Sequence, residues 1–165
     1  MNKAIFLDRD GVLNKELGTY VATVETFEVL PHIISNLKRF IDNGFLLIVI
    51  TNQGGIAKKL YTKTELLLIH QKLKQHLLVH GVMFTDIYYC PHHPDFAQCL
   101  CRKPGSIMLE KALAKYNIDA SQSWMIGDTL RDMQAAEAVN VKGLLIESNA
   151  DWTPQADLII NRLKA

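Results

Sequence analysis

Short apolar runs alternate along the chain with stretches whose apolar residues recur at helical spacing. The runs rich in β-favouring residues lie at positions 4–7, 45–50, 87–89, 124–126 and 144–146. Between them, the apolar spacing predicts helices at 33–43, 106–116 and 130–139. Because strands that alternate with helices usually form a parallel sheet, this pattern predicts an α/β fold with a mainly parallel sheet. A weakly amphipathic stretch at 156–160 is predicted to be a last edge strand.

The stretch after Thr62 has the clearest helical pattern. Thr62 and Glu65 have the spacing of a capping box, in which each side chain binds the other residue's backbone N–H. An apolar stripe follows at Leu66, Ile69, Leu73 and Leu77. Gly81 lies just beyond the stripe, as is typical of a helix C-terminus. We therefore expect one long helix between Thr62 and Gly81.

Length and composition favour a single domain over residues 1–165. A chain of 165 residues is close to the usual size of one domain. Lys and Arg number 18 against 17 Asp and Glu, a net charge of +1 that disfavours a nucleic-acid partner. The longest strongly apolar run, 45–50, is far below the roughly 18 residues of a membrane span. The N-terminal apolar stretch 4–7 is too short for a signal-peptide core, so we expect a cytoplasmic protein. We also expect a monomer.

Polar residues gather where the predicted strands end. They are Asp8 and Asp10 after the first strand, Thr51 and Asn52 after the second, residues 90–103 after the third, and Asp128 and Asp132 after the fourth. The carboxyl ends of parallel strands lie at one edge of the sheet, which is where open α/β sheets bind their ligands. Four segments that are distant in the sequence are therefore predicted to form one site.

The acidic residues of this site favour a divalent cation. Two carboxylates about 4 Å apart repel each other by about 4 kcal/mol at an effective dielectric constant of about 20, so an acidic cluster normally binds a cation. Oxygen ligands of this kind are typical of Mg²⁺. An EF-hand loop is excluded, because Gly11 is the fourth residue counted from Asp8 and an EF-hand has its glycine at the sixth position.

Thr51, Asn52 and Lys103 supply hydrogen-bond donors and a positive charge for a phosphoryl group. An ionised Asp needs no base in order to attack phosphorus, but its repulsion from a phosphate dianion must be neutralised, which Mg²⁺ and Lys103 would do. A second Asp close by would protonate the departing alkoxide. Together these residue types indicate phosphoryl transfer.

The three cysteines indicate a second, different metal. Cys90 and His92 form one short pair, and Cys99 and Cys101 form another after six intervening residues. Four such ligands complete a closed tetrahedral Zn²⁺ site, which is structural because it leaves no position for water. The symmetry of the two pairs favours His92, while His93 stays open as the alternative ligand.

Two other classes of protein remain open at this point. A phospho-accepting signalling receiver also uses acids, Thr and Lys, but its acidic pair precedes an acceptor Asp on a middle strand, whereas Asp8 and Asp10 open this chain. A zinc-stabilised binding module with a dead catalytic site is disfavoured by the intact acids and Lys103. Release of phosphate from a generic phosphate ester would separate both classes from an enzyme.

Four segments resemble the four motifs of the haloacid dehalogenase (HAD) superfamily of phosphatases. In chain order they are Asp8-Arg9-Asp10-Gly11-Val12-Leu13-Asn14, Thr51-Asn52-Gln53, Cys101-Arg102-Lys103-Pro104 and Gly127-Asp128-Thr129-Leu130-Arg131-Asp132. The match spans nearly the whole chain. It implies a HAD-like, Rossmann-type three-layer fold with a zinc-bound loop, and the intervals between motifs leave no room for a large cap domain.

The resemblance also implies a role for each catalytic residue. Asp8 would be the nucleophile that forms an aspartyl-phosphate, and Asp10 would act first as general acid and then as base. Thr51 and Lys103 would hold the phosphoryl group, and Asn52 would bind the substrate. These roles describe a phosphoric monoester hydrolase.

The metal ligands follow from the same resemblance. Mg²⁺ would be bound by Asp8, Asp128 and the backbone carbonyl of Asp10. Asp132, the second acid of the last motif, would lie outside the direct ligands of the metal.

The zinc loop that runs into Lys103 narrows the resemblance to two families, the D-glycero-D-manno-heptose 1,7-bisphosphate phosphatases and the histidinol-phosphate phosphatases. The segments that resemble the heptose enzymes more closely are 18–21, 51–57, 87–94 and 132–136. The implied substrate is a small phosphorylated sugar, a heptose 1,7-bisphosphate that loses its C7 phosphate in the pathway to nucleotide-activated heptose for lipopolysaccharide. Arg102 would pair with the second phosphate. Histidinol phosphate, or another small sugar phosphate, remains the alternative substrate.

Overall fold

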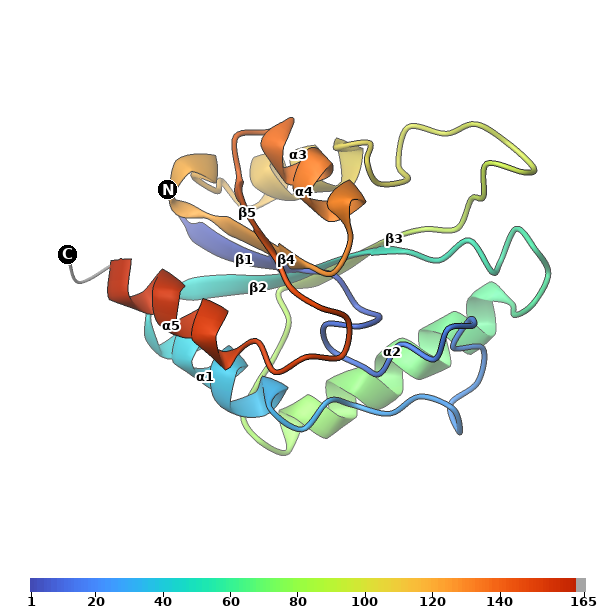
Figure 1. The fold of residues 1–165 in the computed structure, drawn as a ribbon, viewed down its shortest axis with the longest axis horizontal. Helices are drawn as coiled ribbons and strands as arrows, with labels where there is room; N and C mark the ends of the chain where they lie inside the picture. Colours follow the sequence, from blue (N-terminus) through green and yellow to red (C-terminus); the bar gives the residue numbers. More distant parts are fainter. Residues whose placement is uncertain (163–165) are drawn as a thin grey trace.

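The computed structural model describes residues 1–162 and has a parallel sheet between two layers of helices (Figure 1). The strands are β1 (Lys3–Leu7), β2 (Phe45–Asn52), β3 (Asp86–Cys90), β4 (Trp124–Gly127) and β5 (Lys142–Leu145). They lie in the order β3-β2-β1-β4-β5, and each neighbouring pair is parallel. The predicted α/β fold with a parallel sheet is confirmed.

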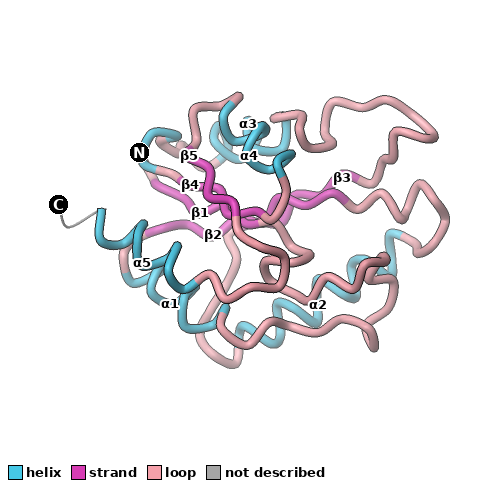
Figure 2. Tube along the Cα trace, in the orientation of Figure 1, coloured by secondary structure: helices cyan, strands magenta, loops and turns pink. Residues whose placement is uncertain are grey.

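Helices cover both faces of this sheet (Figure 2). They are α1 (Ile33–Asp42), α2 (Lys63–Leu78), α3 (Ile107–Lys115), α4 (Leu130–Glu137) and α5 (Thr153–Arg162), with the short 3-10 helix η1 (Ala120–Gln122) before β4. Helices α3 and α4 lie on one face, and α1, α2 and α5 lie on the other (Figure 1). This is the three-layer arrangement that the sequence predicts.

The alternation of side chains in the central strand β1 divides the core into two clusters. Ile5 and Leu7 pack in the cluster that includes α1, α2 and α5. Ala4 and Phe6 point to the opposite face and pack in the cluster that includes α3 and α4. All of these side chains are fully buried. A strand buried on both faces holds its carboxyl end rigidly, and Asp8 follows immediately.

The start of α2 confirms the predicted capping box. The backbone N–H of Glu65 donates to the Thr62 hydroxyl at 3.2 Å, and the Glu65 carboxylate accepts from the Thr62 N–H at 2.6 Å. The predicted stripe of Leu66, Ile69, Leu73 and Leu77 is buried, and the last three residues belong to the core cluster on this face of the sheet.

The prediction of an edge strand at 156–160 is wrong, because this segment belongs to helix α5. Its buried residues Ala156, Ile159 and Ile160 are spaced three and four apart, which is a helical period. The preceding Trp152 stacks on Phe40 of α1, with ring centroids 6.2 Å apart. The edge of the sheet is instead β5, which begins two residues before the predicted position.

The segments between the four motifs form the strands, helices and loops of this one sheet, so residues 1–162 contain no inserted cap domain. The prediction of a single domain includes residues 163–165, which lie outside the described residues. Within residues 1–162, each helix is too short or too polar to span a bilayer.

Candidate active site

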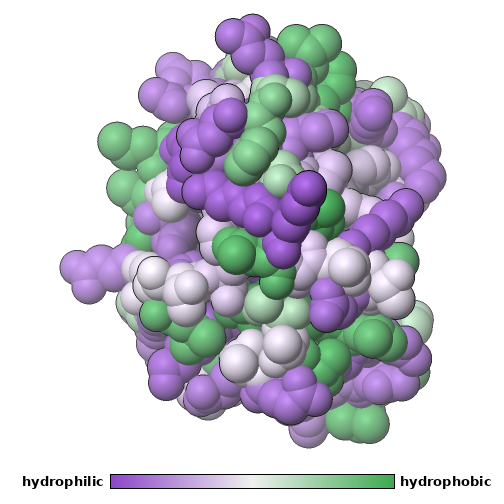
Figure 3. Space-filling view, turned by 90° about the vertical axis from the view of Figure 1, so that its right-hand side faces the viewer, coloured by the Kyte–Doolittle hydropathy of each residue, from purple (hydrophilic) through white to green (hydrophobic). Residues whose placement is uncertain are grey.

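A cavity of about 450 Å³ opens at the carboxyl ends of β1, β2 and β4. Its lining includes most of the site residues predicted from the sequence, namely Asp8, Asp10, Thr51, Asn52, Arg102, Lys103 and Asp128. The strand order reverses direction at β1, which makes this the usual position for a ligand site in an open α/β sheet. The loops after β2 and β3 lie on the same side of the molecule, where hydrophilic and apolar residues are mixed (Figure 3).

Lys103 lies at the centre of the site and is only 2% exposed. Its Nζ lies 2.9 Å from Oδ1 of Asp8 and 2.5 Å from Oδ1 of Asp132. It also donates to the backbone carbonyl of Ile50 at 2.7 Å. Burial alone would lower the pKa of Lys103, but the two carboxylates raise it above its usual value. Lys103 is therefore a fixed, buried cation beside Asp8.

Asn52 holds the backbone of Lys103 in place. Its Nδ2 donates to the Lys103 carbonyl at 3.1 Å, and its Oδ1 accepts from the Lys103 N–H at 3.0 Å. Both ends of the amide are thus bonded to the loop that carries the lysine. Asn52 was expected to bind the substrate, and its contacts with the backbone of Lys103 were not predicted.

Asp8, Asp128 and Asp132 each offer a carboxylate oxygen, and these oxygens lie within 4.8 Å of one another. Burial, together with Asp132 and Asp10, raises the pKa of Asp8 to about 7, although Lys103 acts in the opposite direction. Burial also raises the pKa of Asp128. A divalent cation would favour the ionised form of both groups, so these residues fit Mg²⁺.

Gly11 allows Asp128 to approach the first motif. A Cβ atom at position 11 would lie 2.2 Å from Oδ2 of Asp128 and 2.4 Å from Oγ of Ser148. Gly11 also has a φ of +80°, which other residues adopt only with strain. The glycine of the first motif is therefore required both for its backbone conformation and for space.

Asp132 is fully buried and uses both carboxylate oxygens within the protein. Its Oδ2 accepts from the Thr129 N–H at 3.1 Å and from the Thr129 hydroxyl at 2.7 Å, which caps α4. Its Oδ1 pairs with Lys103. This arrangement joins the start of α4 to the lysine.

Asp10 is held by donors from three side chains. Arg9 Nη2 lies 2.8 Å from Oδ1 of Asp10, Asn14 Nδ2 lies 2.9 Å from the same oxygen, and Gln53 Nε2 lies 2.9 Å from Oδ2. Burial would raise the pKa of Asp10, but the Arg9 guanidinium and these hydrogen bonds lower it below its usual value. The carboxylate therefore has a fixed orientation.

Sequence reasoning assigned no role to Arg9 or Gln53, although both lie inside quoted motifs. Arg9 is only 1% exposed, which is rare for an arginine, and Nη1 contacts Nε2 of His70 at 3.4 Å. The ring nitrogen of His70 must accept this bond, since a guanidinium has no acceptor. The one available signal was the position of these polar residues directly after buried strands.

Cys90, His92, Cys99 and Cys101 converge as predicted, with one ligand atom of each within 4.8 Å of the others. Cys90 Sγ lies 3.6 Å from both Cys99 Sγ and His92 Nδ1, and His92 Nδ1 lies 3.2 Å from Cys101 Sγ. The cysteines form no disulfide. Three thiols and one imidazole in this arrangement fit a structural Zn²⁺ ion.

His93 lies outside this cluster, so the structure favours His92 over its alternative. His93 lines the cavity, and its Nδ1 lies 3.2 Å from Oδ2 of Asp95. Arg102 lines the same cavity while its Nη1 donates to the His92 carbonyl at 3.1 Å. The Cys/His loop, residues 90–103, therefore presents the side chains of His93 and Arg102 to the active site.

Further residues to which the sequence gave no individual role also line the cavity. They are Glu16, Gly18, Thr19, Tyr20, Val21, Thr129 and Arg131.

Comparisons with known proteins agree with this site. A HAD-hydrolase-like family model matches residues 100–163. The chain is 38% identical to a D-glycero-beta-D-manno-heptose-1,7-bisphosphate 7-phosphatase of Haemophilus ducreyi, over 98% of this chain and 94% of that protein. It is 40% identical to a D-glycero-alpha-D-manno-heptose-1,7-bisphosphate 7-phosphatase of Photorhabdus laumondii, over 84% of this chain and 79% of that protein.

A solved structure of a heptose-bisphosphate phosphatase also matches this chain. The crystal structure of a D,D-heptose 1,7-bisphosphate phosphatase from B. bronchiseptica, complexed with magnesium and phosphate, matches with a TM-score of 0.84 and 32% identity. The match covers 94% of this chain and 86% of that one. The resemblance found in the four motifs is confirmed. The chain is a phosphatase of the HAD superfamily and belongs to the same family as these heptose-bisphosphate phosphatases.

Proposed function

We propose that the protein removes the C7 phosphate of a D-glycero-D-manno-heptose 1,7-bisphosphate through an aspartyl-phosphate on Asp8, in the supply of nucleotide-activated heptose for lipopolysaccharide. The observation that carries the substrate is the identity of 38–40% with relatives named for this reaction. The site supports the reaction class, because Asp8 and Lys103 lie 2.9 Å apart at the base of the cavity.

In the first step, a carboxylate oxygen of Asp8 attacks the C7 phosphorus and the sugar oxygen departs. Lys103 and the buried Thr51 hydroxyl hold the phosphoryl oxygens as negative charge develops on them. Because its pKa is lowered, Asp10 is ionised in the free enzyme, so it must take up a proton together with the substrate before it gives one to the departing alkoxide. In the second step, Asp10 takes a proton from the water that releases phosphate from Asp8.

Mg²⁺ would be bound by Asp8, Asp128 and the backbone carbonyl of Asp10. When bound, it supplies positive charge that reduces the repulsion between the Asp8 carboxylate and the phosphate. The proximity of the Asp8 and Asp128 oxygens and the raised pKa values of both groups support this assignment.

Zn²⁺ would be bound by Cys90, His92, Cys99 and Cys101 and would fix the loop that continues into Arg102 and Lys103. Within that loop, Arg102 would pair with the second phosphate of the substrate, since its side chain lines the cavity. We also propose that the enzyme is a cytoplasmic monomer, which size-exclusion chromatography with light scattering and cell fractionation would test.

A comparison of substrates tests the proposed function. The enzyme with Mg²⁺ would be given both anomers of the heptose 1,7-bisphosphate, the heptose 7-phosphate and histidinol phosphate. The account predicts the highest kcat/KM for one anomer of the bisphosphate, with the heptose 1-phosphate as product. Faster hydrolysis of histidinol phosphate would overturn the substrate while leaving the aspartyl-phosphate mechanism intact.

A further inference from the structure

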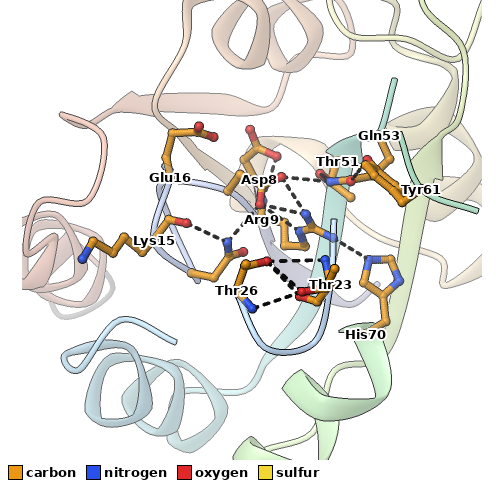
Figure 4. A network of polar contacts seen from close by, with 12 residues as sticks. Asp8, Arg9, Lys15, Glu16, Thr23, Thr26, Thr51, Gln53, Tyr61 and His70 are labelled. Atoms are coloured by element: carbon orange, nitrogen blue, oxygen red, sulfur yellow. Dashed lines mark hydrogen bonds and ion pairs between the residues drawn. The ribbon is translucent and has the colours of Figure 1, made fainter. Parts of the chain in front are cut away.

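Tyr61 makes a buried hydrogen bond to the glutamine that contacts Asp10. It lies at the end of the loop after β2, directly before the Thr62 cap of α2, and is 4% exposed. Its hydroxyl lies 2.6 Å from Oε1 of Gln53 (Figure 4). Burial raises the pKa of Tyr61 to about 12, so the phenol keeps its proton and donates it to this bond.

This bond determines which way the Gln53 amide points. With Oε1 bound to Tyr61, Nε2 donates to Oδ2 of Asp10 and to the hydroxyl of Thr51, each at 2.9 Å. If the amide rotated by half a turn, its oxygen would face the Asp10 carboxylate, and two acceptors would meet without a proton between them. Without the Tyr61 hydroxyl, only the contacts on the Nε2 side would keep the Gln53 amide from rotating.

The ring of Tyr61 has its own structural support. It packs against Tyr20, which lines the cavity, with ring centroids 6.2 Å apart. A Cβ atom at Gly55 would lie 2.2 Å from Cε1 of Tyr61 and 3.0 Å from Cδ1 of Tyr20. Gly55 does not have a positive φ, so its backbone would accept alanine and only the rings would have to move. The absence of a side chain at position 55 leaves the space that Tyr61 occupies.

We propose that Tyr61 is a positioning residue for the acid–base step: its hydroxyl fixes the Gln53 amide in the orientation that holds the Asp10 carboxylate towards the leaving group. The proposal rests on the role of Asp10 in the proposed function. Tyr61 itself does not contact the reacting atoms. Its effect is expected only where proton transfer by Asp10 limits the rate.

The variant Tyr61→Phe removes the hydroxyl and keeps the ring. The rate of leaving-group release in a single turnover would be measured on a sugar phosphate, whose alkoxide needs a proton to depart, and on p-nitrophenyl phosphate, whose phenolate does not. We expect a loss of about tenfold in this rate on the sugar phosphate, a part of the roughly 100-fold or more that a general acid contributes, and less than about twofold on the nitrophenyl ester.

Two further variants make the test independent of a single substitution. Gly55→Ala keeps the hydroxyl but displaces the ring, and should produce the same selective loss on the sugar phosphate. Tyr116→Phe is the matched control, because it also removes a phenol hydroxyl that donates a hydrogen bond. The acceptor of that bond is Asp86, at 2.8 Å, which lies at the opposite end of the strands from the active site. This control should leave the rates on both substrates unchanged.

Equal losses on both substrates in Tyr61→Phe would mean a general structural role and would overturn the proposal, as would an unchanged rate on the sugar phosphate. Asp10→Asn in the same assay separates this failure from that of the proposed function. If Asp10→Asn shows the selective loss and Tyr61→Phe does not, only the inference about Tyr61 fails. If Asp10→Asn slows the release of both leaving groups equally, Asp10 is not the acid and the proposed mechanism fails with it.

Discussion

The ammonium group of Lys103 lies 2.9 Å from Oδ1 of Asp8, although strands β2 and β3 lie between the two residues in the sequence. The same ammonium group contacts Asp132, which caps helix α4. One buried cation therefore connects the end of β1, the Cys/His loop and the start of α4.

Lys103→Met should lower kcat more than about 100-fold, because an electrostatic donor to the developing charge is lost. It should also lower the free energy of unfolding by about 3–5 kcal/mol in the absence of added Mg²⁺, since Asp8 and Asp132 stay buried without a counter-ion. Steady-state kinetics and urea unfolding measure the two effects. Lys115→Met, which removes an exposed ion pair with Asp86, is the control and should change neither quantity appreciably. Wild-type turnover in Lys103→Met would contradict the arrangement.

Gly11→Ala should lose most activity and bind Mg²⁺ more weakly, because the new methyl group would occupy the position of the Asp128 carboxylate. The positive φ adds strain of about 1–2 kcal/mol, which thermal unfolding would register. Gly81→Ala separates the two causes, since Gly81 has a similar φ of +74° but open space around it. We expect Gly81→Ala to lose stability and keep activity. If Gly81→Ala were equally inactive, backbone strain alone would explain the loss of activity in Gly11→Ala, and the clash with Asp128 would not be needed.

The buried His70 should make stability depend on pH. Burial, assisted by the Arg9 guanidinium, lowers its pKa from 6.5 to about 3. Between these two values the unfolded chain binds the proton and the folded chain does not, so stability falls as pH falls below about 6.5. From about pH 6.5 to about pH 4.5 this group should cost on the order of 2 kcal/mol.

His70→Gln tests the assignment, because the Gln carbonyl can accept from Arg9 and has no proton to gain. Urea unfolding at both pH values should show a smaller loss for the variant than for the wild type. Parallel losses in the two proteins would assign the acid sensitivity to other groups.

Elemental analysis of the purified protein should find about one zinc per chain, bound at the Cys/His cluster. Cys99→Ala should lose this metal and lower kcat indirectly, since the loop that carries Lys103 is no longer fixed, while the requirement for Mg²⁺ is unchanged. His93→Gln should retain zinc, because His93 lies outside the cluster and faces the cavity. Loss of zinc from His93→Gln with retention in His92→Gln would reverse the ligand assignment.

Periodicity and motif position were enough to predict the sheet and the convergence of the site. The strands at 4–7, 45–50 and 124–126 are largely buried runs bounded by polar residues, and the Thr62 cap marks the start of α2. The segment 156–160 was misread because five residues are too few to separate the two periods, and the burial of Ala156, Ile159 and Ile160 that identifies the helix depends on tertiary packing.

The contacts of Asp10 could not be predicted in the same way. Three separate segments supply the residues around it, namely Arg9, Gln53, Tyr61 and His70. Their local sequence does not indicate that these side chains are in contact. Burial of an arginine and a histidine depends on the packing of α2 against the sheet, which is a tertiary property. The sequence thus identified the groups that would contact phosphate and missed those that orient them.

The central claim is that Asp8 is the nucleophile, and trapping the intermediate tests it most directly. The enzyme would be mixed with the heptose 1,7-bisphosphate, quenched in acid within the first turnover, and digested for mass spectrometry. The account predicts an acyl phosphate on the peptide that contains Asp8, at Asp8 itself, and its absence in Asp8→Asn, which should fold normally and release no phosphate. Phosphate attached to any other residue, or undiminished turnover by Asp8→Asn, would contradict it.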